Sequence, residues 1–348
     1  VVPKGDGAVG SWATTTFMPV RRQLHEATAY NGYLYVAGGR SQSVSVDQST
    51  VYSAPIRGNG TIGSFTTLTY LPIKLGVLTA EAYNGYLFVV GGTQEDAGGA
   101  YQSTVYSAPI KSDGTIGAFS TLTYLPQVKG YSGLSTYNGY LFLAGGGSGN
   151  SFSTVYSAKT NSDGTIGTWN TLTDLPTALY GLKMAASNGY LYVTAGATVP
   201  GDAYISTVWS SPINSDGTIG TWSTLNYLPG ARYQPDIKVY NGYLYVVGGF
   251  APTGGRQSTV YSASIKADGT IGIWNTTYSP VRFYAHPVVV YNGNLYVPGG
   301  ENGTGTVAST VYSASLTTSR AFVFNANSQI WPESTGLGGS AALFDIQN

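Results

Sequence analysis

Short apolar runs in which Tyr, Leu and Val alternate recur along this chain, and each run lies between two pairs of turn residues. The first run is YLYVA at residues 33–37, with Asn-Gly before it and Gly-Gly after it. Alternating β-branched and aromatic residues over about five to eight positions are typical of β-strands. Asn-Gly tolerates the positive φ angles of a tight hairpin turn. Because no stretch shows a sustained helical period, the pattern predicts an all-β protein.

The run is part of a unit that occurs six times. Its Asn-Gly pair begins at Asn31, Asn84, Asn138, Asn188, Asn241 and Asn292. A second block, STVYS or STVWS, follows each run, and a third block such as SDGTIGTWNTLTDLP completes the unit. Repeats of about 50 residues are typical of arrays such as propellers. With one strand per block and one before the apolar run, the chain is predicted to form six four-stranded antiparallel sheets.

Four features of the unit carry a resemblance to a known family. They are the apolar run ending in Gly-Gly, the Tyr of the second block, a later Leu-Pro, and an aromatic residue after the third turn, which is Trp12, Phe65, Phe119, Trp169, Trp222 or Trp274. In these features residues 11 to about 316 resemble the kelch family of β-propellers. The spacing from Tyr106 to Phe119 is wider than the family pattern, which lengthens the outer hairpin. The resemblance implies a six-bladed β-propeller, in which radial stacking buries both faces of each sheet.

The two ends of the repeat region complement each other. The sixth unit ends after STVYSASL without its outer strand, whereas residues 5–19 align with the third block of the other units. We therefore expect an N-terminal strand to close the last blade, within a propeller domain of residues 1–318.

A C-terminal extension, residues 319–348, matches no repeat. Its larger apolar side chains are Phe322, Phe324, Trp331, Leu343 and Phe344. This tail either covers apolar surface on its own propeller or adds a strand to the exposed edge of a neighbouring copy. A head-to-tail contact of the second kind need not close, so it would build a filament or surface layer.

Charge is scarce and balanced in this chain. Sixteen basic and sixteen acidic residues make up 9% of its 348 residues and give a formal net charge of zero, where ordinary soluble domains carry roughly 25% charged residues. The sequence therefore predicts no nucleic-acid partner, because phosphate binding needs clustered Lys and Arg. No apolar run reaches the ~20 residues of a membrane-spanning helix.

A nearly neutral surface rich in Ser, Thr, Tyr and Gly suits packing against copies of itself, other surface proteins or glycans. The chain has no Cys, so it forms no disulfide or thiolate metal site. We expect a secreted protein, extracellular or at the cell surface, whose signal peptide is absent from this chain.

Charged and aromatic residues concentrate in the segments that we expect to form the innermost strands, at residues 21–30, 74–83, 128–137, 178–187, 231–240 and 282–291. In propellers these strands begin at one mouth of the central channel, where ligands usually bind. The predicted ligand-binding residues are Arg22, His25, Glu26, Lys129, Tyr180, Arg232, Tyr233, Arg282, Tyr284 and His286. The alternative is that a solvated channel merely tolerates polar side chains.

An enzymatic role has weaker support. Sialic-acid mutarotases are similar to this chain in having six kelch blades, and their chemistry would need an acid–base Glu with Arg nearby. Glu26, Glu81, Arg22 and Arg232 supply these residue types, but no motif places them together. The segment SDGTIGTW at residues 162–169 resembles the sialidase Asp box only superficially, since its Asp stands one residue early.

The sequence predicts no metal site and no cofactor. Two His residues lack the clustered acidic or Cys partners of metal sites. The recurrent Asp113, Asp163, Asp216 and Asp268 are expected to accept backbone hydrogen bonds in turns.

Three functional classes follow. The first is a non-enzymatic extracellular module with a structural or adhesive role, which assembles with copies of itself through its tail. The alternative is a carbohydrate-binding module that uses the channel mouth, and the third is an epimerase-like enzyme.

Overall fold

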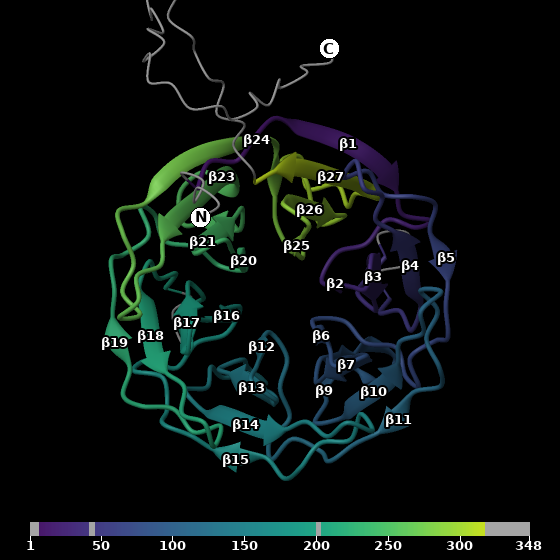
Figure 1. Ribbon diagram of the computed structural model, residues 1–348, viewed down its shortest axis with the longest axis horizontal. Helices are drawn as coiled ribbons and strands as arrows, with labels where there is room; N and C mark the ends of the chain where they lie inside the picture. Colours follow the sequence, from purple (N-terminus) through teal and green to yellow (C-terminus); the bar gives the residue numbers. More distant parts are fainter. Residues whose placement is uncertain (1–6, 42–45, 200–202, 317–348) are drawn as a thin grey trace, which may run out of the picture. The chain divides into compact units, whose positions relative to one another are not determined.

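The computed structural model describes residues 7–41, 46–199 and 203–316. Within them, six β-sheets stand in a ring around a central channel, and each sheet forms one blade (Figure 1). The predicted six-bladed propeller of four-stranded antiparallel blades is therefore confirmed. The predicted tail and its aromatic side chains lie outside the described residues, and the boundary at residue 318 stays a prediction.

The strands of each blade are given from the channel outward. Blade 1 consists of β2 (Glu26–Tyr30), β3 (Tyr33–Ala37), β4 (Val51–Pro55) and β5 (Thr66–Thr67). Blade 2 consists of β6 (Thr79–Tyr83), β7 (Tyr86–Val90), β10 (Val105–Pro109) and β11 (Ser120–Thr121). Blade 3 consists of β12 (Gly133–Tyr137), β13 (Tyr140–Ala144), β14 (Val155–Lys159) and β15 (Asn170–Thr171).

The remaining blades follow the same order. Blade 4 consists of β16 (Lys183–Ser187), β17 (Tyr190–Thr194), β18 (Val208–Pro212) and β19 (Ser223–Thr224). Blade 5 consists of β20 (Asp236–Tyr240), β21 (Tyr243–Val247), β23 (Gly255–Ser264) and β24 (Asn275–Phe283), with the short β22 (Phe250–Ala251) paired to β23. Blade 6 consists of β25 (Val289–Tyr291), β26 (Asn294–Pro298), β27 (Thr310–Ser315) and β1 (Trp12–Phe17). A loop of blade 2 adds the ribbon of β8 (Thr93–Gln94) and β9 (Ala100–Tyr101) around a 3-10 turn at Glu95–Ala97.

Blade 6 joins the two ends of the repeat region, as the sequence predicts. Strand β1 pairs antiparallel with β27, with Trp12 opposite Ala314 and Phe17 opposite Thr310. Figure 1 shows the N-terminal strand running beside the last strands of the chain. The pairing covers the outer edge that β27 would otherwise expose and closes the ring without a covalent link.

Packing between neighbouring blades explains two of the repeated sequence blocks. Gly114, in the outer turn of blade 2, has a φ of +80°, and a Cβ atom there would lie 2.2 Å from the ring of Tyr33 in blade 1. Gly164 meets Tyr86 in the same way between blades 2 and 3. The Tyr of each NGY turn thus lies on the Gly of the next blade's outer turn. In that turn the Asp113 carboxylate accepts hydrogen bonds from the Thr115 N–H and hydroxyl, at 2.9 and 2.6 Å, which is the structural role expected for it.

The innermost strands are shorter than the sequence suggests. One residue with a positive φ, between 45° and 64°, precedes the innermost strand of each blade. It lies two positions before β2, β6, β12, β16 and β20, and at the matching position in blade 6. These residues, here called the inner belt, are Leu24, Val77, Tyr131, Gly181, Gln234 and Ala285. The prediction that the inner strands begin at residues such as 21 and 74 was wrong, because the belt residue with its positive φ interrupts the extended backbone. Only one belt residue is Gly, so the sequence carries no signal for this conformation.

The inner belt connects the blades around the channel. The N–H groups of five belt residues donate to the carbonyl of the belt residue in the preceding blade, at 2.9 to 3.2 Å. For example, Val77 donates to Leu24, and Leu24 donates to Ala285 across the closure between blades 6 and 1. These hydrogen bonds fix the width of the channel at this level.

Candidate functional site

Three of the predicted site residues are cations buried inside blades. Arg22, Lys129 and Arg232 occupy the same position in blades 1, 3 and 5, and at most 4% of each residue is exposed. At this position blades 2, 4 and 6 carry Leu75, Leu179 and Phe283. The structure therefore places the three cations in the blade interiors, where an apolar residue serves equally well in the other blades.

Each buried cation is held by neutral partners. The Arg232 guanidinium donates to the Tyr261 hydroxyl at 2.6 Å and to the Thr259 hydroxyl at 2.9 Å, and it lies 5.2 Å from the Tyr261 ring centroid. Arg22 contacts the equivalent residues, Thr50 and Tyr52. Electron-rich ring faces and hydroxyl oxygens offset part of the cost of burying a charge.

Lys129 is the third buried cation. Its Nζ donates to the Gly145 carbonyl at 2.7 Å and to the Thr154 hydroxyl, and it lies about 5 Å from the Phe152 and Tyr156 rings. Burial lowers the pKa of Lys129 to about 7, with Asp174 opposing the shift weakly.

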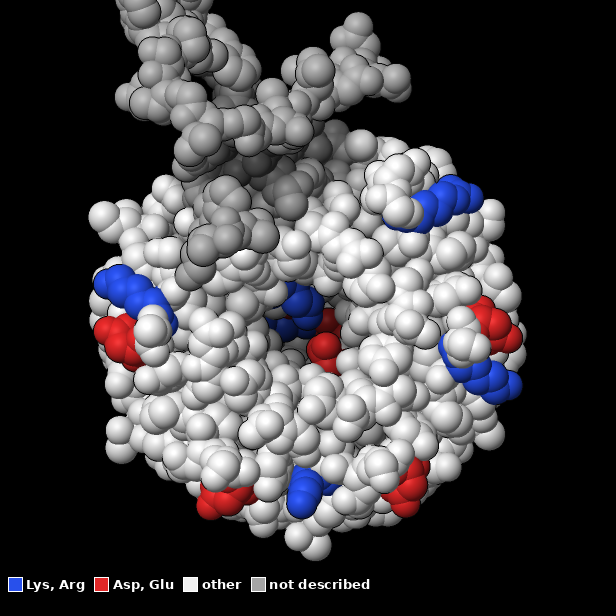
Figure 2. Space-filling model, in the orientation of Figure 1, with Lys and Arg blue, Asp and Glu red and all other residues white. Residues whose placement is uncertain are grey.

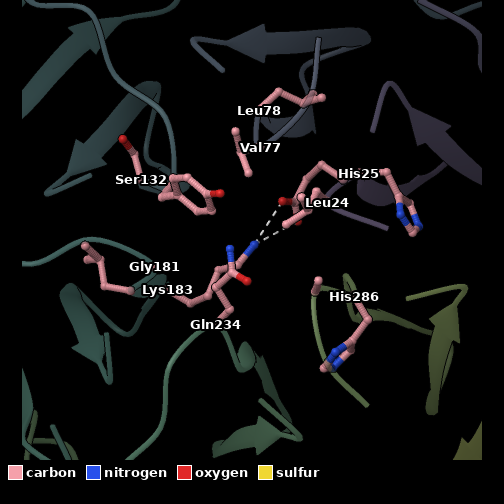
Figure 3. A pocket seen from close by; sticks show the side chains of 13 residues that line it. Leu24, His25, Val77, Leu78, Ser132, Gly181, Lys183, Gln234 and His286 are labelled. Atoms are coloured by element: carbon pink, nitrogen blue, oxygen red, sulfur yellow. Dashed lines mark hydrogen bonds and ion pairs between the residues drawn. The ribbon is translucent and has the colours of Figure 1, made fainter. Parts of the chain in front are cut away.

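The two His residues lie between blades. His25 is buried, and its Nε2 lies 2.9 Å from the carbonyl oxygen of Pro298 in blade 6. Burial lowers the pKa of His25 to about 3, with the Arg22 charge as the second cause, and burial lowers that of His286 to about 4. In Figure 3 both imidazoles point away from the centre of the cavity that their backbones line. Both rings are therefore neutral packing groups at pH 7.

Arg282 lies elsewhere on the propeller. It is exposed and belongs to β24, the outermost strand of blade 5. The expectation that an inner strand begins at this residue was wrong, because blade 5 extends its outer strand to Phe283.

A cluster of charged side chains fills the channel itself. The Lys183 Nζ from blade 4 donates to the Glu26 carboxylate from blade 1 at 2.9 Å, so this salt bridge crosses the channel (Figure 3). Asp236 of blade 5 lies 4.0 Å from the Lys183 Nζ and 3.9 Å from the Lys238 Nζ. Glu81 of blade 2 interacts electrostatically with Lys238. These five residues are called the channel cluster below.

Burial separates the acidities of the cluster carboxylates. Burial raises the pKa of Glu26 to about 7 in spite of the attraction of Lys183. Burial would also raise the pKa of Asp236, but Lys238, Lys183 and the Val288 N–H together hold it below its usual value. Burial raises the pKa of Glu81 as well. Asp236 thus stays ionised, whereas burial favours the protonated form of Glu26 and Glu81.

The cavity beside the Glu26–Lys183 salt bridge is small. Its volume is about 40 Å³, and it is lined by the six inner-belt residues together with Glu26 and Lys183. One water molecule needs roughly 10–15 Å³ by this measure, so the space suits about three waters and no sugar ring. An acid–base role for Glu26 on a sugar therefore has no room in this structure.

An open cluster of aromatic rings, here called the aromatic mouth, stands where the inner strands begin. It is formed by Tyr131, Tyr180, Tyr204, Tyr233, Phe250 and Tyr284. The Tyr180 and Tyr233 ring centroids are 5.1 Å apart, and Tyr204 stacks on Tyr233 at 5.5 Å. The structure thus brings together the predicted residues Tyr180, Tyr233 and Tyr284.

A groove opens at the aromatic mouth over blades 2 to 5. It has a volume of about 340 Å³, and its lining includes Tyr101, Tyr131, Tyr180, Tyr233 and Asn150. Tyr131 lines both this groove and the small cavity. Sequence reasoning did not single out Tyr101, Asn150 and Tyr204, because they lie in loops between the second and third strands. These loops differ in length and sequence while the strands repeat, and this difference could have marked the loops as candidate parts of the site.

Charges are sparse on the rest of the surface. On the face shown in Figure 2 acidic and basic side chains appear inside the channel and at a few places near the periphery, and most atoms are uncharged. At the edge of the aromatic mouth, Arg256 pairs with Glu301 at 2.8 Å and lies 5.9 Å from the Phe250 and Tyr284 ring centroids. This compensated cation stands at the edge of the mouth and is not part of the groove lining.

The described part of the chain contains neither a cluster of metal ligands nor a helix that could span a membrane. Among residues 7–41, 46–199 and 203–316, no three His, Asp or Glu side chains lie where they could share a metal ion. The same residues include no helix long and apolar enough to cross a membrane.

Comparison with known proteins supports the fold. No family model matches the chain. A segment is 30% identical over 91 residues to human Kelch-like protein 31, which covers 25% of this chain and only 14% of the human protein. The solved structure titled "Structure of YjhT" superposes with a TM-score of 0.69 at 14% identity, over 86% of this chain and 96% of that one. At this identity the structural likeness concerns the fold alone.

Proposed function

We propose that this six-bladed β-propeller, which resembles the kelch type, is a non-enzymatic binding module whose aromatic mouth takes an uncharged carbohydrate. The observation that carries this proposal is the groove of about 340 Å³ lined by Tyr101, Tyr131, Tyr180 and Tyr233. Binding sites for small ligands typically enclose about 300–1,000 Å³ and combine aromatic walls with a few polar groups.

The chemistry of the groove suits a sugar. Tyr faces pack against the C–H faces of a pyranose ring, and each Tyr hydroxyl donates or accepts one hydrogen bond. The Asn150 side chain adds both a donor and an acceptor. Among the residues that the structure describes, no carboxylate or cation lines the groove, which favours a neutral ligand over an acidic one.

The same geometry argues against catalysis in the channel. Glu26, the acid–base candidate, is 5% exposed and bound to Lys183. The cavity beside it has room for water alone. A sugar in the groove is separated from this carboxylate by the inner belt, which contributes Tyr131 to both spaces.

A glycan array followed by calorimetry with a short neutral oligosaccharide tests the proposal. We expect one binding site per chain and a loss of binding of at least tenfold in Tyr180→Ala and Tyr233→Ala, since each removes a wall of the groove. Ile273→Ala, a change at an exposed residue outside the groove, is the control and leaves the affinity unchanged. A wild-type array without a single positive neutral glycan overturns the proposal.

A structural or adhesive role at the cell surface is the second proposal. It is supported by the sparse charge of the chain and of the face in Figure 2, because little electrostatic repulsion opposes contact with copies of itself or other surface proteins. Extracellular location is part of this proposal. Deletion of residues 319–348, compared with the full chain by light scattering, tests assembly through the tail. A full chain that is already monomeric contradicts it.

A further inference from the structure

A second surface of this propeller presents aromatic side chains in a regular pattern. Five large aromatic residues are between 56% and 67% exposed, and they occupy one equivalent position in five of the six blades. These rim aromatics are Phe17, Tyr70, Tyr124, Tyr227 and Tyr278. Each belongs to the outermost strand of its blade or lies three residues beyond it. None of them lines the groove or the cavity described above.

The fold holds each rim position in place from inside the blade. The residue after four of the rim aromatics is buried, and its N–H donates to the carbonyl of the Ser before the third strand. Blade 3 has a matching hydrogen bond, and all five are 2.7 to 2.8 Å long. They join Met18 to Ser309, Leu71 to Ser49, Leu125 to Ser103, Leu175 to Ser153 and Leu228 to Ser206. The rim side chain is therefore turned outward by a fixed backbone.

Blade 3 shows that the fold does not need an aromatic residue at this position. Asp174 stands there, and its carboxylate accepts a hydrogen bond from the Ser153 hydroxyl at 3.1 Å. The neighbouring Leu175 is buried and keeps the same backbone bond as its equivalents. Because a polar side chain is accommodated without change, folding alone does not explain five exposed rings.

The surroundings of the rim aromatics indicate a neutral, hydroxyl-rich ligand. The outermost strands β1, β5, β11, β15 and β19 consist of Thr, Ser, Asn, Ala and aromatic residues and carry no charge, whereas β24 of blade 5 carries Arg282. The next blade adds a half-buried ring beside the rim position in several places. The Trp169 Nε1 donates to the carbonyl of Thr123, which precedes Tyr124, at 3.2 Å, and Trp274 donates to the carbonyl of Asn226, which precedes Tyr227, at 3.2 Å.

The spacing of the rings distinguishes a polymer from a protein partner. Every blade except blade 3 carries one rim aromatic, and short polar strands separate the rings, so they form isolated platforms. Large contiguous apolar patches, by contrast, mark protein–protein and membrane interaction sites. Isolated platforms repeated around a ring suit a ligand that repeats as well, because weak linked contacts combine into strong binding.

From these observations we infer that the rim aromatics form a multivalent binding surface for a neutral polysaccharide. Each exposed ring stacks on one sugar unit, and the Ser and Thr hydroxyls of the outermost strands bond to sugar hydroxyls. This surface is distinct from the groove of the aromatic mouth, which takes a short oligosaccharide.

Native gel electrophoresis of the full chain in gels that contain a soluble β-glucan, mannan or xylan tests the inference, with polygalacturonate as the acidic comparison. We expect retardation by at least one neutral polysaccharide. Replacement of all five rim aromatics by Ser lowers the apparent affinity by about a hundredfold or more, and any single replacement lowers it by roughly two- to fivefold, since linked contacts multiply. Asp174→Tyr strengthens retardation, because it adds the sixth platform.

Two controls separate this surface from the mouth and from misfolding. The five-position variant keeps the circular dichroism spectrum, the thermal midpoint and the oligosaccharide affinity of the wild type, whereas Tyr233→Ala keeps retardation by the polymer. Ile273→Ser, which removes an exposed aliphatic side chain, changes neither. The inference is overturned if no neutral polysaccharide retards the wild type, or if the five-position variant is retarded equally. It is also overturned if light scattering shows that the rim aromatics serve only to join copies of the chain.

Discussion

Buried cations occur in two regions of this propeller, and the protein stabilises them in different ways. In the channel, Lys183 and Lys238 face the carboxylates of Glu26 and Asp236. Inside blades 1, 3 and 5 the cations bond to hydroxyls, carbonyls and ring faces, with no carboxylate in contact. The attraction of Glu26 and Asp236 outweighs burial and raises the pKa of Lys183, whereas burial lowers the pKa of Lys129 to about 7.

The fold depends on the two groups of charges to different degrees. If the carboxylate partner of a channel cation is removed, a charge is left uncompensated in a confined space. A blade cation has an apolar equivalent in the next blade, so the position itself does not require charge. The blade cations are interchangeable packing elements, and the channel cluster is a coupled electrostatic unit.

The largest effect is expected in the channel. Asp236 is 2% exposed, faces two Lys residues and accepts the N–H of Ile237 at 2.7 Å and that of Val288. Asp236→Ala should lower the free energy of unfolding by about 3–5 kcal/mol, because it leaves buried charges and N–H groups without a partner. Urea unfolding measures this loss. Asp236→Asn keeps an acceptor and is expected to lose less, and an unchanged stability in both variants would contradict the coupled cluster.

A smaller effect is expected in blade 3. Lys129→Leu introduces the residue that blades 2 and 4 carry at this position, and the free energy of unfolding should change by less than about 1 kcal/mol. Lys129→Ala leaves a cavity and should cost about 2–3 kcal/mol. The two variants are compared by the same urea titration. A loss in Lys129→Leu as large as that in Lys129→Ala would show that the ammonium group itself is required.

The pH dependence of stability is expected to have opposite signs in the two regions. The raised pKa of Glu26, about 7 against 4.5, stabilises the folded state at low pH, and this contribution is lost as the pH rises from about 4.5 to 7. The lowered pKa of Lys129, about 7 against 10.5, means that the unfolded chain binds more protons between these values, so stability rises with pH there. Urea unfolding at several pH values, with Glu26→Gln and Lys129→Leu as references, checks both slopes. Parallel curves for wild type and variant would contradict the corresponding assignment.

Local sequence patterns were sufficient to predict the ring and its closure. Period-two alternation and Asn-Gly turns define strands and hairpins within a few residues of each other, and the partial third block at residues 5–19 identifies the missing strand of blade 6. The inner belt was missed because residues such as Leu24 and Val77 adopt positive φ without being Gly. That conformation also moved Arg22 into the blade, where the sequence suggested the channel.

The candidate site was predictable in part. Tyr180, Tyr233 and Tyr284 were identified because they lie in the segments expected to form the inner strands, and equivalent residues of these segments meet around the channel. Tyr101, Tyr204 and Asn150 come from loops that follow no repeat, so nothing in the sequence placed them at the same mouth. The rim aromatics were visible as a repeated residue, but their exposure depends on how the outermost strands pack.

The number of blades, the order of their strands and the turns between them could be predicted, because they depend on residues close together in the chain. The contact of Glu26 with Lys183 across the channel joins residues 157 positions apart and arises from the fold. The fold also places three cations inside blades and brings Tyr side chains from several blades together in one groove. Contacts of this kind form only once the ring has closed. The width of the channel is then set by blade packing and by backbone hydrogen bonds between blades, which no local sequence pattern encodes.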